Sequence, residues 1–331
     1  MIPPKKAGSA NERFSPFSYP AYHFQLNDLP SEDGVILAEK EKYCQEQSFG
    51  VLQLYTKLNY EDRKMKLTML GTGNALVTEC YNTCFILEDK GQLFMTDGGG
   101  GNTVLHQIKH AGYDWMDIRH IFVTHKHVDH LLGIVWMVRM ICQFMNHGEY
   151  KGEAFIYSHR EVLDLLRDMA DKLLQKKESV YIDKRLHFVE VSDGESREII
   201  GHKVTFFDIQ STKAKQFGFQ MELEEGKTLT CCGDEPLTSE LEKYAEGSEW
   251  MLHEAFCLYS QADIFDPYEK HHSTVKDACE MAERLGVKNM LLYHTEDRNL
   301  KNRKALYREE GGKYYHGSLW IPDDLEVIEL P

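Results

Sequence analysis

The most constraining feature of this 331-residue chain is a run of four potential metal ligands within six residues. The run, His125-Lys126-His127-Val128-Asp129-His130, directly follows the apolar segment Ile121-Phe122-Val123-Thr124. That segment has the pattern of a short buried strand, and a strand end places side chains at a surface where a site can form. Imidazole and carboxylate are the ligands that zinc and similar divalent ions prefer. The run therefore predicts a metal site rather than a solvated loop with chance histidines.

From residue 66 onwards, strand-like and helix-like segments are interleaved. The first strands are joined by a turn at Asp89-Lys90-Gly91, whereas helical stretches separate the later ones. This order favours an α/β (α+β) fold of two mixed β-sheets packed together, with helices outside. We expect helices at 102–111, 128–144, 160–176 and 272–285. We expect strands at 66–70, 83–88, 92–96, 121–124, 154–157, 186–191, 203–209, 217–223, 228–232, 250–253, 289–294 and 325–329.

Residues 1–65 differ from the rest of the chain, because they hold five of its nine prolines among scattered aromatic residues. A helix is expected at 31–47, where Ser31 can act as the cap and acidic residues crowd the first turn. We find no catalytic signal in this region. We interpret residues 1–65 as an extension that packs on the main domain or forms an oligomer contact, and residues 66–331 as the catalytic domain.

Composition narrows the class of partner. The formal net charge of −15 disfavours a protein that grips long nucleic acids, because phosphate binding relies on lysine and arginine displacing counterions. No run of eighteen apolar residues and no secretory signal is found, so we expect no membrane span and a cytoplasmic location. The eight cysteines show no C-x-x-C spacing and are interpreted as reduced thiols.

The order of the motifs resembles the metallo-β-lactamase superfamily over residues 66–331. Asp97 ends a strand and is followed by glycines, Asp234 lies in Cys232-Gly233-Asp234, and His294 lies in Leu291-Leu292-Tyr293-His294-Thr295. The resemblance implies an αββα sandwich with a site for one or two metal ions along one sheet edge. It implies that Asp97 orients a ligand histidine from outside the ligand set. The implied ligands are His125, His127, Asp129, His130, Asp234 and His294, for zinc, with manganese or iron as alternatives.

The finer pattern is most similar to ribonuclease Z, the endonuclease that trims the 3′ end of tRNA precursors. Leu252-His253-Glu254-Ala255-Phe256 resembles its His-Glu-Ala-Thr segment, and His272-Ser273-Thr274 resembles its His-Ser-Thr segment. The resemblance implies cleavage of phosphodiester bonds by metal-activated hydroxide. Asp129 would help to take a proton from the attacking water, and His272, aided by Glu254, would donate one to the leaving oxygen. His253 would support these residues from outside the ligand set.

The residues alone leave other interpretations of this segment open. His272 can be the neighbour of a helix cap formed by Ser273, and Glu254 can be a buried structural carboxylate.

Two departures from ribonuclease Z bear on metal and substrate. That family has a histidine ligand six residues before the glycine that here is Gly218, a position that holds Thr212. The His125–His127 side of the site therefore lacks one implied ligand, so one or two ions can be bound. The family also often carries a long basic arm between the positions of Gly218 and Gly233, whereas here only fourteen residues separate the two glycines, with one lysine among them.

The sequence thus predicts a metal-dependent hydrolase acting on a small phosphodiester, such as a cyclic nucleotide, or on an RNA 3′ end. The resemblance also implies a homodimer. Two alternatives stay open: a hydrolase of a small ester, thioester or lactone on the same fold, and a metal-weakened, non-catalytic binding protein. Substrate, metal identity and the role of residues 1–65 do not follow from the sequence.

Overall fold

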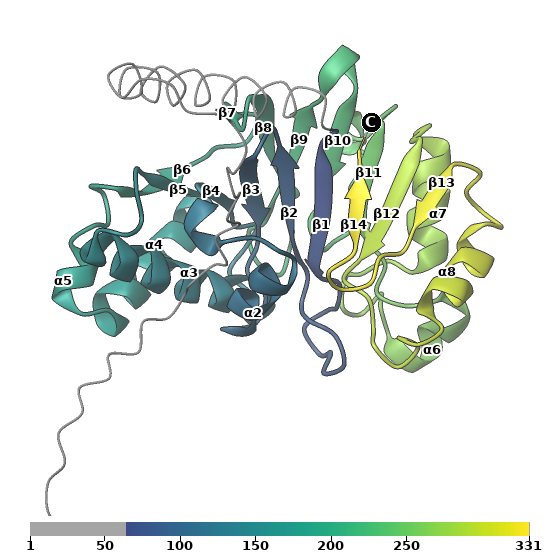
Figure 1. Ribbon diagram of the computed structural model, residues 1–331. Helices are drawn as coiled ribbons and strands as arrows, with labels where there is room; N and C mark the ends of the chain where they lie inside the picture. The colour runs from purple at the N-terminus through teal and green to yellow at the C-terminus, as the bar shows by residue number, and fades with distance from the viewer. Residues whose placement is uncertain (1–63, 331) are drawn as a thin grey trace, which may run out of the picture. The chain divides into compact units, whose positions relative to one another are not determined.

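The structure, a computed structural model, describes residues 64–330, so the predicted extension and its helix at 31–47 lie outside the described residues. Within them the chain forms two seven-stranded sheets (Figure 1). The first sheet has the order β14-β1-β2-β3-β4-β5-β6. Its strands from β14 to β3 are antiparallel, and those from β3 to β6 are parallel. They are β1 (Lys66–Gly71), β2 (Cys84–Asp89), β3 (Gln92–Thr96), β4 (His120–Phe122), β5 (Ala154–Ser158), β6 (Leu186–Glu190) and β14 (Val327–Glu329).

The second sheet has the order β13-β12-β11-β10-β9-β8-β7. Its strands from β7 to β10 are antiparallel, and those from β10 to β13 are parallel. Both sheets are therefore mixed, as predicted. Its strands are β7 (Ser196–Ile199), β8 (His202–Asp208), β9 (Phe217–Glu222), β10 (Thr228–Cys231), β11 (Trp250–Glu254), β12 (Asn289–Tyr293) and β13 (Ser318–Trp320).

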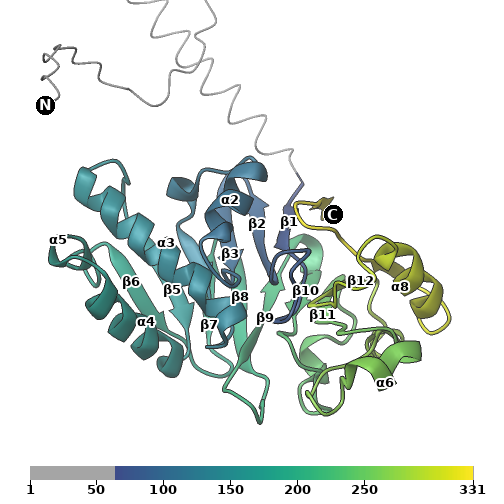
Figure 2. The ribbon, with the colours of Figure 1, turned by 90° about the horizontal axis from the view of Figure 1, so that it is seen from below.

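Helices flank each sheet, as Figures 1 and 2 show: α2 to α5 lie beside the first sheet and α6 to α8 beside the second. The α-helices are α2 (Thr103–His110), α3 (Val128–His147), α4 (Arg160–Leu173), α5 (Lys176–Ser179), α6 (Ala262–Phe265), α7 (Val275–Arg284) and α8 (Arg303–Gly311). Short 3-10 turns occur at Trp115–Asp117, Glu224–Gly226, Glu242–Tyr244 and Tyr259–Gln261.

The hydrophobic core is layered because strand side chains alternate between the two faces of a sheet. In β1, Leu67 and Met69 face the space between the sheets, while Leu70 joins the layer under α3. In β12, Leu291 faces the inter-sheet layer and Met290 faces the layer under α7. Three buried layers result, which is the arrangement of an αββα sandwich. The predicted fold is confirmed.

Helix α3 is the one helix of the described residues that is long and apolar enough to cross a membrane by length and composition. Of that stretch, 56% is buried inside the fold. It has the character of a core helix, because its own residues Ile134 and Met137 belong to the buried layer between α3 and the first sheet.

Several elements differ from the sequence prediction. The helix expected at 160–176 ends at Leu173, and the helix expected at 272–285 begins at Val275. Its cap is Thr274, which forms a capping box with Asp277, so the interpretation of Ser273 as the cap is wrong. Strands β7 and β13 and helix α8 were not predicted, because the strands are short edge elements and α8 is rich in charged residues.

Candidate metal centre

Polar side chains meet at one edge of the sandwich because parallel strands of both sheets end there. In the first sheet, Asp97 follows β3, and the H-x-H-x-D-H run joins β4 to α3. In the second sheet, Asp234 follows β10, Glu254 ends β11 and His294 follows β12. Carboxyl ends of parallel strands in one sheet lie side by side, so residues distant in sequence converge. The structure brings all six residues predicted as metal ligands into two neighbouring groups.

The inner position consists of Asp129, His130, His294 and one carboxylate oxygen of Asp234. His130 Nε2 lies 3.3 Å from Asp129 Oδ2 and 3.6 Å from Asp234 Oδ2. His294 Nε2 lies 3.5 Å and 3.7 Å from the same two oxygens. Ligand atoms around a tetrahedral ion with bonds of about 2.0–2.2 Å are about 3.3–3.6 Å apart.

The inner atoms are also poorly satisfied by the protein itself. His130 Nε2, His294 Nε2 and Asp234 Oδ1 are buried without a hydrogen-bond partner in the described residues. Buried polar atoms normally have partners. Spacing, donor chemistry and the missing partners together fit a divalent ion.

The outer position consists of His125, His127 and Asp234, whose ligand atoms lie within 4.8 Å of one another. His125 Nε2 is 3.5 Å from Asp234 Oδ2 but only 2.8 Å from His127 Nδ1, with which it shares a hydrogen bond. That N–N separation is shorter than two ligands of one ion allow. The His125 and His127 rings would have to move apart for both to bind one ion. The outer position thus fits a metal less well than the inner one.

Asp234 Oδ2 links the two positions. It lies 3.5 Å from His125 Nε2, 3.6 Å from His130 Nε2 and 3.7 Å from His294 Nε2. This one oxygen is therefore within reach of ligand histidines of both positions. Asp234 follows Gly233, whose φ is +77°. A residue with a side chain would be strained in this conformation, so glycine is favoured there.

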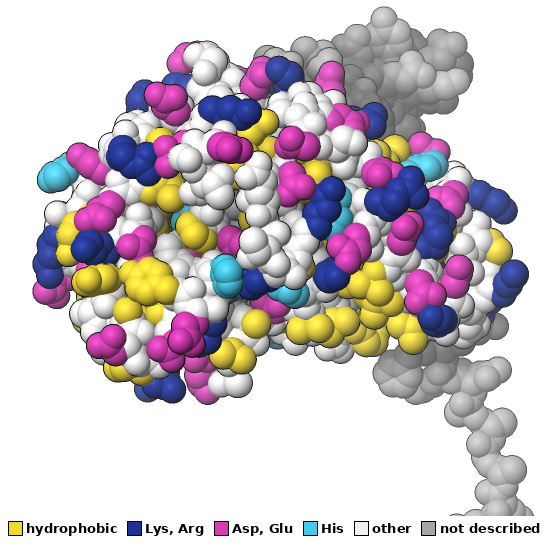
Figure 3. Space-filling view, turned by 180° about the vertical axis from the view of Figure 1, so that it is seen from behind, with side chains coloured by type: hydrophobic (Ala, Val, Ile, Leu, Met, Phe, Trp, Pro, Cys, Tyr) yellow, Lys and Arg dark blue, Asp and Glu magenta, His cyan; other side chains and the backbone are white. Residues whose placement is uncertain are grey.

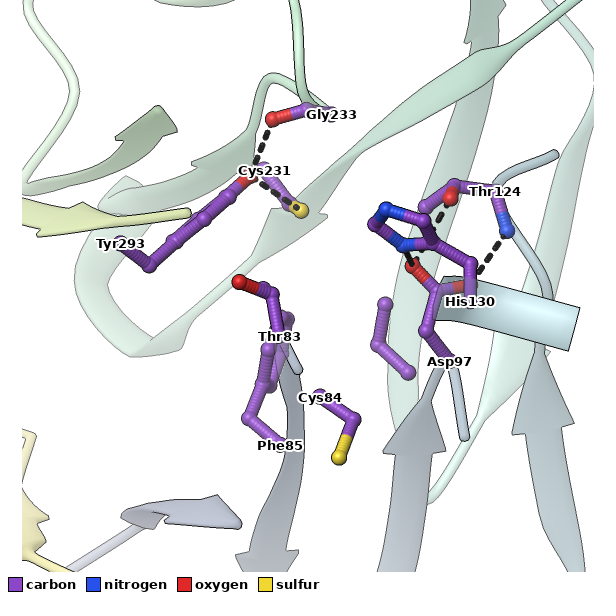
Figure 4. A pocket seen from close by; sticks show the side chains of 10 residues that line it. Thr83, Cys84, Phe85, Asp97, Thr124, His130, Cys231, Gly233 and Tyr293 are labelled. Carbon is purple, nitrogen blue, oxygen red and sulfur yellow. Dashed lines mark hydrogen bonds and ion pairs between the residues drawn. The ribbon is translucent and has the colours of Figure 1, made fainter. Parts of the chain in front are cut away.

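Asp97 orients ligand residues of the first sheet through hydrogen bonds with His130 and Thr124 (Figure 4). Its Oδ2 is 2.7 Å from His130 Nδ1 and accepts the Thr124 hydroxyl at 2.8 Å, while Oδ1 accepts the Thr124 N–H at 2.8 Å. The Thr124 hydroxyl is also 2.9 Å from His125 Nδ1. When both Nδ1 atoms carry the proton, the Nε2 lone pairs of His125 and His130 face the centre. One carboxylate therefore orients one histidine of each position.

Helix α3 is fixed against the loop after β3 by close backbone contact. Gly98 donates its N–H to the His130 carbonyl at 2.9 Å, and Gly133 donates to the Gly99 carbonyl at 2.9 Å. A Cβ placed on Gly133 would lie 1.7 Å from the Gly98 carbonyl oxygen. No side chain fits there. The glycines thus hold Asp97 at a fixed distance from the helix that carries His130.

Beside the inner position, Glu254 and His272 form a second polar pair. One Glu254 oxygen accepts both the N–H and the hydroxyl of Ser273. The other oxygen lies 3.7 Å from His272 Nδ1, and neither of these two atoms has a hydrogen-bond partner within the described part of the chain. The His272 ring stacks on Phe256 at 4.8 Å between centroids. Ser273, far from capping the helix, positions Glu254.

His253, by contrast, does not reach the centre. It precedes Glu254 in β11, so the two side chains leave opposite faces of the sheet. Its Nδ1 bonds to the Glu254 carbonyl at 2.6 Å, and its Nε2 has no hydrogen-bond partner in the described residues. It belongs to none of the candidate metal groups.

Burial and charge set the protonation of the centre before a metal binds. Burial lowers the pKa of His125 well below its usual value, against the pull of Asp234. Burial would also lower the pKa of His130, but the Asp129 and Asp97 carboxylates outweigh it and hold that pKa well above its usual value. Burial opposes ionisation of Asp129, yet His130 and His294 keep its pKa far below the usual range. A metal at the inner position would therefore displace a proton from His130.

The centre opens into a cavity of about 560 Å³. Its lining includes predicted residues, but also lysines and apolar side chains that sequence reasoning did not single out. Leu76 and Val128 are 73% and 62% exposed, and Phe256 lies deeper. No spacing signal marks these residues, because the loops that carry them are far apart in sequence. They are Ala75, Leu76, Lys126, Val128, Lys213, Phe256 and Lys270.

Thr212 does not replace the implied histidine ligand. Its hydroxyl lies 3.5 Å from His271 Nδ1, and both residues are exposed. Neither joins a candidate metal group among the described residues.

Comparison with known proteins now decides the family. The sequence profile described as "Anti-Pycsar protein Apyc1" matches residues 65–312, which is well over half of the chain. The protein belongs to the Anti-Pycsar protein Apyc1 family.

Relatives of this family member bear out the predicted resemblance. Ribonuclease Z of Shouchella clausii is 25% identical over 310 residues, covering 80% of this chain and 97% of that protein. The metallo-β-lactamase fold protein YhfI of Bacillus subtilis aligns with a TM-score of 0.63 and 16% identity, over 81% of this chain and all of that one. The Zn²⁺-bound PqqB of Methylobacterium extorquens aligns at 0.61 with 13% identity, over 80% and 100%.

These matches settle two points. The similarity to ribonuclease Z is confirmed, and the Apyc1 family member is a hydrolytic enzyme of the metallo-β-lactamase fold. Its two groups of histidines and aspartates have ligand types suited to divalent metal, and a third group in the described residues consists of Glu254, His272 and His294.

Proposed function

We propose that this protein is a metal-dependent phosphodiesterase that hydrolyses a small phosphodiester of the size of a cyclic nucleotide. In this proposal the metal ligands are the six residues of the two positions, and Asp129, His272 and Glu254 are catalytic. Asp97 is a positioning residue. The predicted supporting role of His253 stays a prediction; its one hydrogen bond is to the Glu254 carbonyl.

The observation that carries the proposal is the cavity over the centre. Its volume of about 560 Å³ is that of a small-molecule site. Lys126, Lys213 and Lys270 line it beside the metal ligands, in a chain whose formal net charge is −15. Leu76 and Val128 supply an apolar wall. Basic and apolar groups next to a metal centre suit a ligand with one phosphoryl group and one flat ring.

A long RNA is less well matched. Strands β9 and β10 form a tight hairpin, and the segment between them carries Glu224 and Glu225. Acidic and basic side chains are interspersed over the face shown in Figure 3, without a continuous basic area. Long RNA is normally held by many lysine and arginine contacts to phosphates. These features support a small substrate.

The reaction needs an attacking water and a protonated leaving oxygen. Divalent ions, when bound, acidify water and neutralise charge on phosphoryl oxygens. Asp129 lies in the inner position and is charged at neutral pH, because neighbouring histidines hold its pKa far below the usual range despite burial. Its carboxylate is therefore ionised, which is the form that a proton acceptor for the attacking water requires.

Glu254 and His272 supply the second proton by relay. Burial raises the pKa of Glu254 well above its usual value, whereas burial and His294 lower the pKa of His272 to about 3. Burial thus favours the protonated form of Glu254, and His272 is neutral at neutral pH. His272 can give its Nε2 proton to the leaving oxygen while its Nδ1 takes the proton of Glu254. The 3.7 Å gap between Glu254 Oε2 and His272 Nδ1 must close for the proton transfer.

A second candidate substrate is an RNA 3′ end, favoured by the identity to ribonuclease Z over 80% of the chain. A terminal nucleotide alone would occupy the cavity. The homodimer, the cytoplasmic location and the packing role of residues 1–65 stay predictions.

A substrate panel with purified full-length protein and added zinc or manganese tests the proposal. We expect turnover of 3′,5′-cyclic nucleotides and of bis(p-nitrophenyl) phosphate, with weak or no cleavage of pre-tRNA. Cleavage of pre-tRNA alone would favour the RNA end. Faster turnover of a lactone or thioester than of any phosphodiester would contradict the proposal. Elemental analysis that finds no metal after supplementation would point to the non-catalytic alternative.

A further inference from the structure

The outer position has a lysine beside it where a further ligand would complete it. His125, His127 and Asp234 are its only metal-ligating residues within the described part of the chain. Lys213, on the loop between β8 and β9, lines the same cavity as His127, Asp234 and His272. Its side chain is only 25% exposed. A fixed positive charge thus lies on the less complete side of the centre.

The Lys213 ammonium group is held in place by two partners. It donates to the Lys270 carbonyl at 2.8 Å and lies 3.2 Å from Glu235 Oε1. Glu235 is itself buried, and the same oxygen accepts the Ser211 hydroxyl at 2.8 Å. An ammonium group has three N–H donors. One donates to the Lys270 carbonyl, while Glu235 lies at ion-pair distance, so donor capacity remains for a ligand in the cavity.

The other two lysines of the cavity are directed elsewhere. Lys126 pairs with Glu161 on the surface, and Lys270 donates to the Phe265 carbonyl. Lys213 is therefore the preorganised cation of the three. Its charge also reaches the catalytic groups, since it is among the charges that act on His127, His272 and Glu254.

We propose that Lys213 binds a phosphoryl oxygen of the substrate on the His125–His127 side of the centre, supplying charge that an incompletely ligated outer ion supplies weakly. This rests on the proposed phosphodiesterase function. It follows that the Lys213 side chain takes part in recognising the phosphate.

The test substitutes Lys213→Gln, because an amide can still donate to Glu235 or Lys270 but carries no charge. The matched control is Lys215→Gln, two residues along the same segment, whose ammonium lies 3.7 Å from Asp208 and outside the cavity. Binding of inorganic phosphate to the metal-loaded full-length protein is measured by calorimetry. Metal content and the kinetics on bis(p-nitrophenyl) phosphate are measured in parallel.

We expect Lys213→Gln to weaken phosphate binding about tenfold or more, as for loss of a charged hydrogen bond, and to raise KM. Lys213→Arg should restore most of the binding, and Lys215→Gln should change it less than about twofold. Metal content should stay at the wild-type value in all three variants.

The outcomes separate this proposal from the proposed function. Phosphate binding unchanged in Lys213→Gln, or no phosphate binding by the wild-type protein, would overturn the role of Lys213. A parallel loss of metal, or failure of arginine to rescue, would make Lys213 structural and also overturn it. Wild-type phosphate binding that depends on Lys213 without any phosphodiester turnover would sink the proposed function alone.

Discussion

The two sheets contribute to one centre in different ways. The first sheet gives His125, His127, Asp129 and His130 from one run of six residues, and Asp97 contacts His130. The second sheet gives Asp234 and His294, with Glu254, His272 and Lys213 nearby, from separate loops. The first contribution is local in sequence, and the second is assembled only by folding.

The difference extends to how the side chains are held. First-sheet ligands are fixed by backbone contacts between α3 and the loop after β3, and by the hydrogen bonds of Asp97. Glu254 is held mainly by Ser273, through its N–H and its hydroxyl, and Glu254 Oε2 and His272 Nδ1 have no hydrogen-bond partner among residues 64–330. We infer that ligands from both sheets hold the metal, whereas the groups that handle the proton of the leaving oxygen come from the second sheet alone.

The largest expected effect is that of His272→Gln. Glutamine cannot relay the Glu254 proton, so turnover of bis(p-nitrophenyl) phosphate should fall about 10²–10⁴-fold, the usual contribution of general acid catalysis. Metal content should not change, because the ligands of both positions remain. Steady-state kinetics and elemental analysis check this. Loss of metal in this variant would break the division between the two sheets.

The next effect concerns His253, which is in the second sheet but outside the centre. Burial lowers its pKa to about 4, against about 6.5 when unfolded. As the pH falls from 6.5 to 4, the unfolded chain takes up a proton that the folded protein does not, so stability is lost. His253→Phe removes this titrating group. The drop in unfolding free energy between pH 6.5 and pH 4 should therefore be about 3 kcal/mol smaller than in the wild-type protein.

Urea unfolding of metal-free protein at several pH values measures that slope. The slope matters more than the absolute value, since the variant also loses the bond to the Glu254 carbonyl. An unchanged slope would mean that His253 is protonated in the folded protein.

The sequence could predict the first-sheet contribution almost completely. A strand followed by four ligand-type residues is a local pattern, and the ends of β3 and β4 must lie together because the strands are parallel neighbours. Asp97 could be placed by resemblance. Its second connection, through Thr124 to His125, depends on side-chain directions that no spacing rule gives.

The second-sheet contribution was only partly predictable. Asp234 and His294 follow recognisable strands, but Lys213 lies in an irregular loop, and its partners Glu235 and Lys270 are distant in sequence. Helix α8 was missed because its buried side includes Arg303, a charged residue that bonds to Thr295 and the Pro322 carbonyl. Buried charge with specific partners defeats hydrophobic periodicity.

A smaller effect is expected for Asp97→Asn. The amide can accept only through one oxygen, so either the His130 or the Thr124 contact is lost, and metal affinity should fall about 10–100-fold. Asp324→Asn is the control, since Asp324 accepts the Tyr81 N–H at 2.6 Å and the Thr72 hydroxyl at 2.8 Å without contacting a ligand histidine. Zinc titration against a chelator measures both. Equal losses would indicate general destabilisation instead.

The smallest effect is expected for Thr124→Val. This variant best distinguishes the inner position from the outer one. Valine keeps the N–H bond to Asp97 Oδ1 but loses the hydroxyl that links Asp97 to His125. We expect a loss of about 1 kcal/mol in unfolding free energy, as for one hydrogen bond. His130 keeps its direct contact with Asp97, so the inner ion should be retained while the outer ion dissociates at lower chelator concentration. Zinc titration that shows two steps in the wild-type protein, with only the weaker step shifted in the variant, checks this. A shift of the tighter step instead would mean that Thr124 acts on His130 through Asp97, and that the two positions are not independently supported.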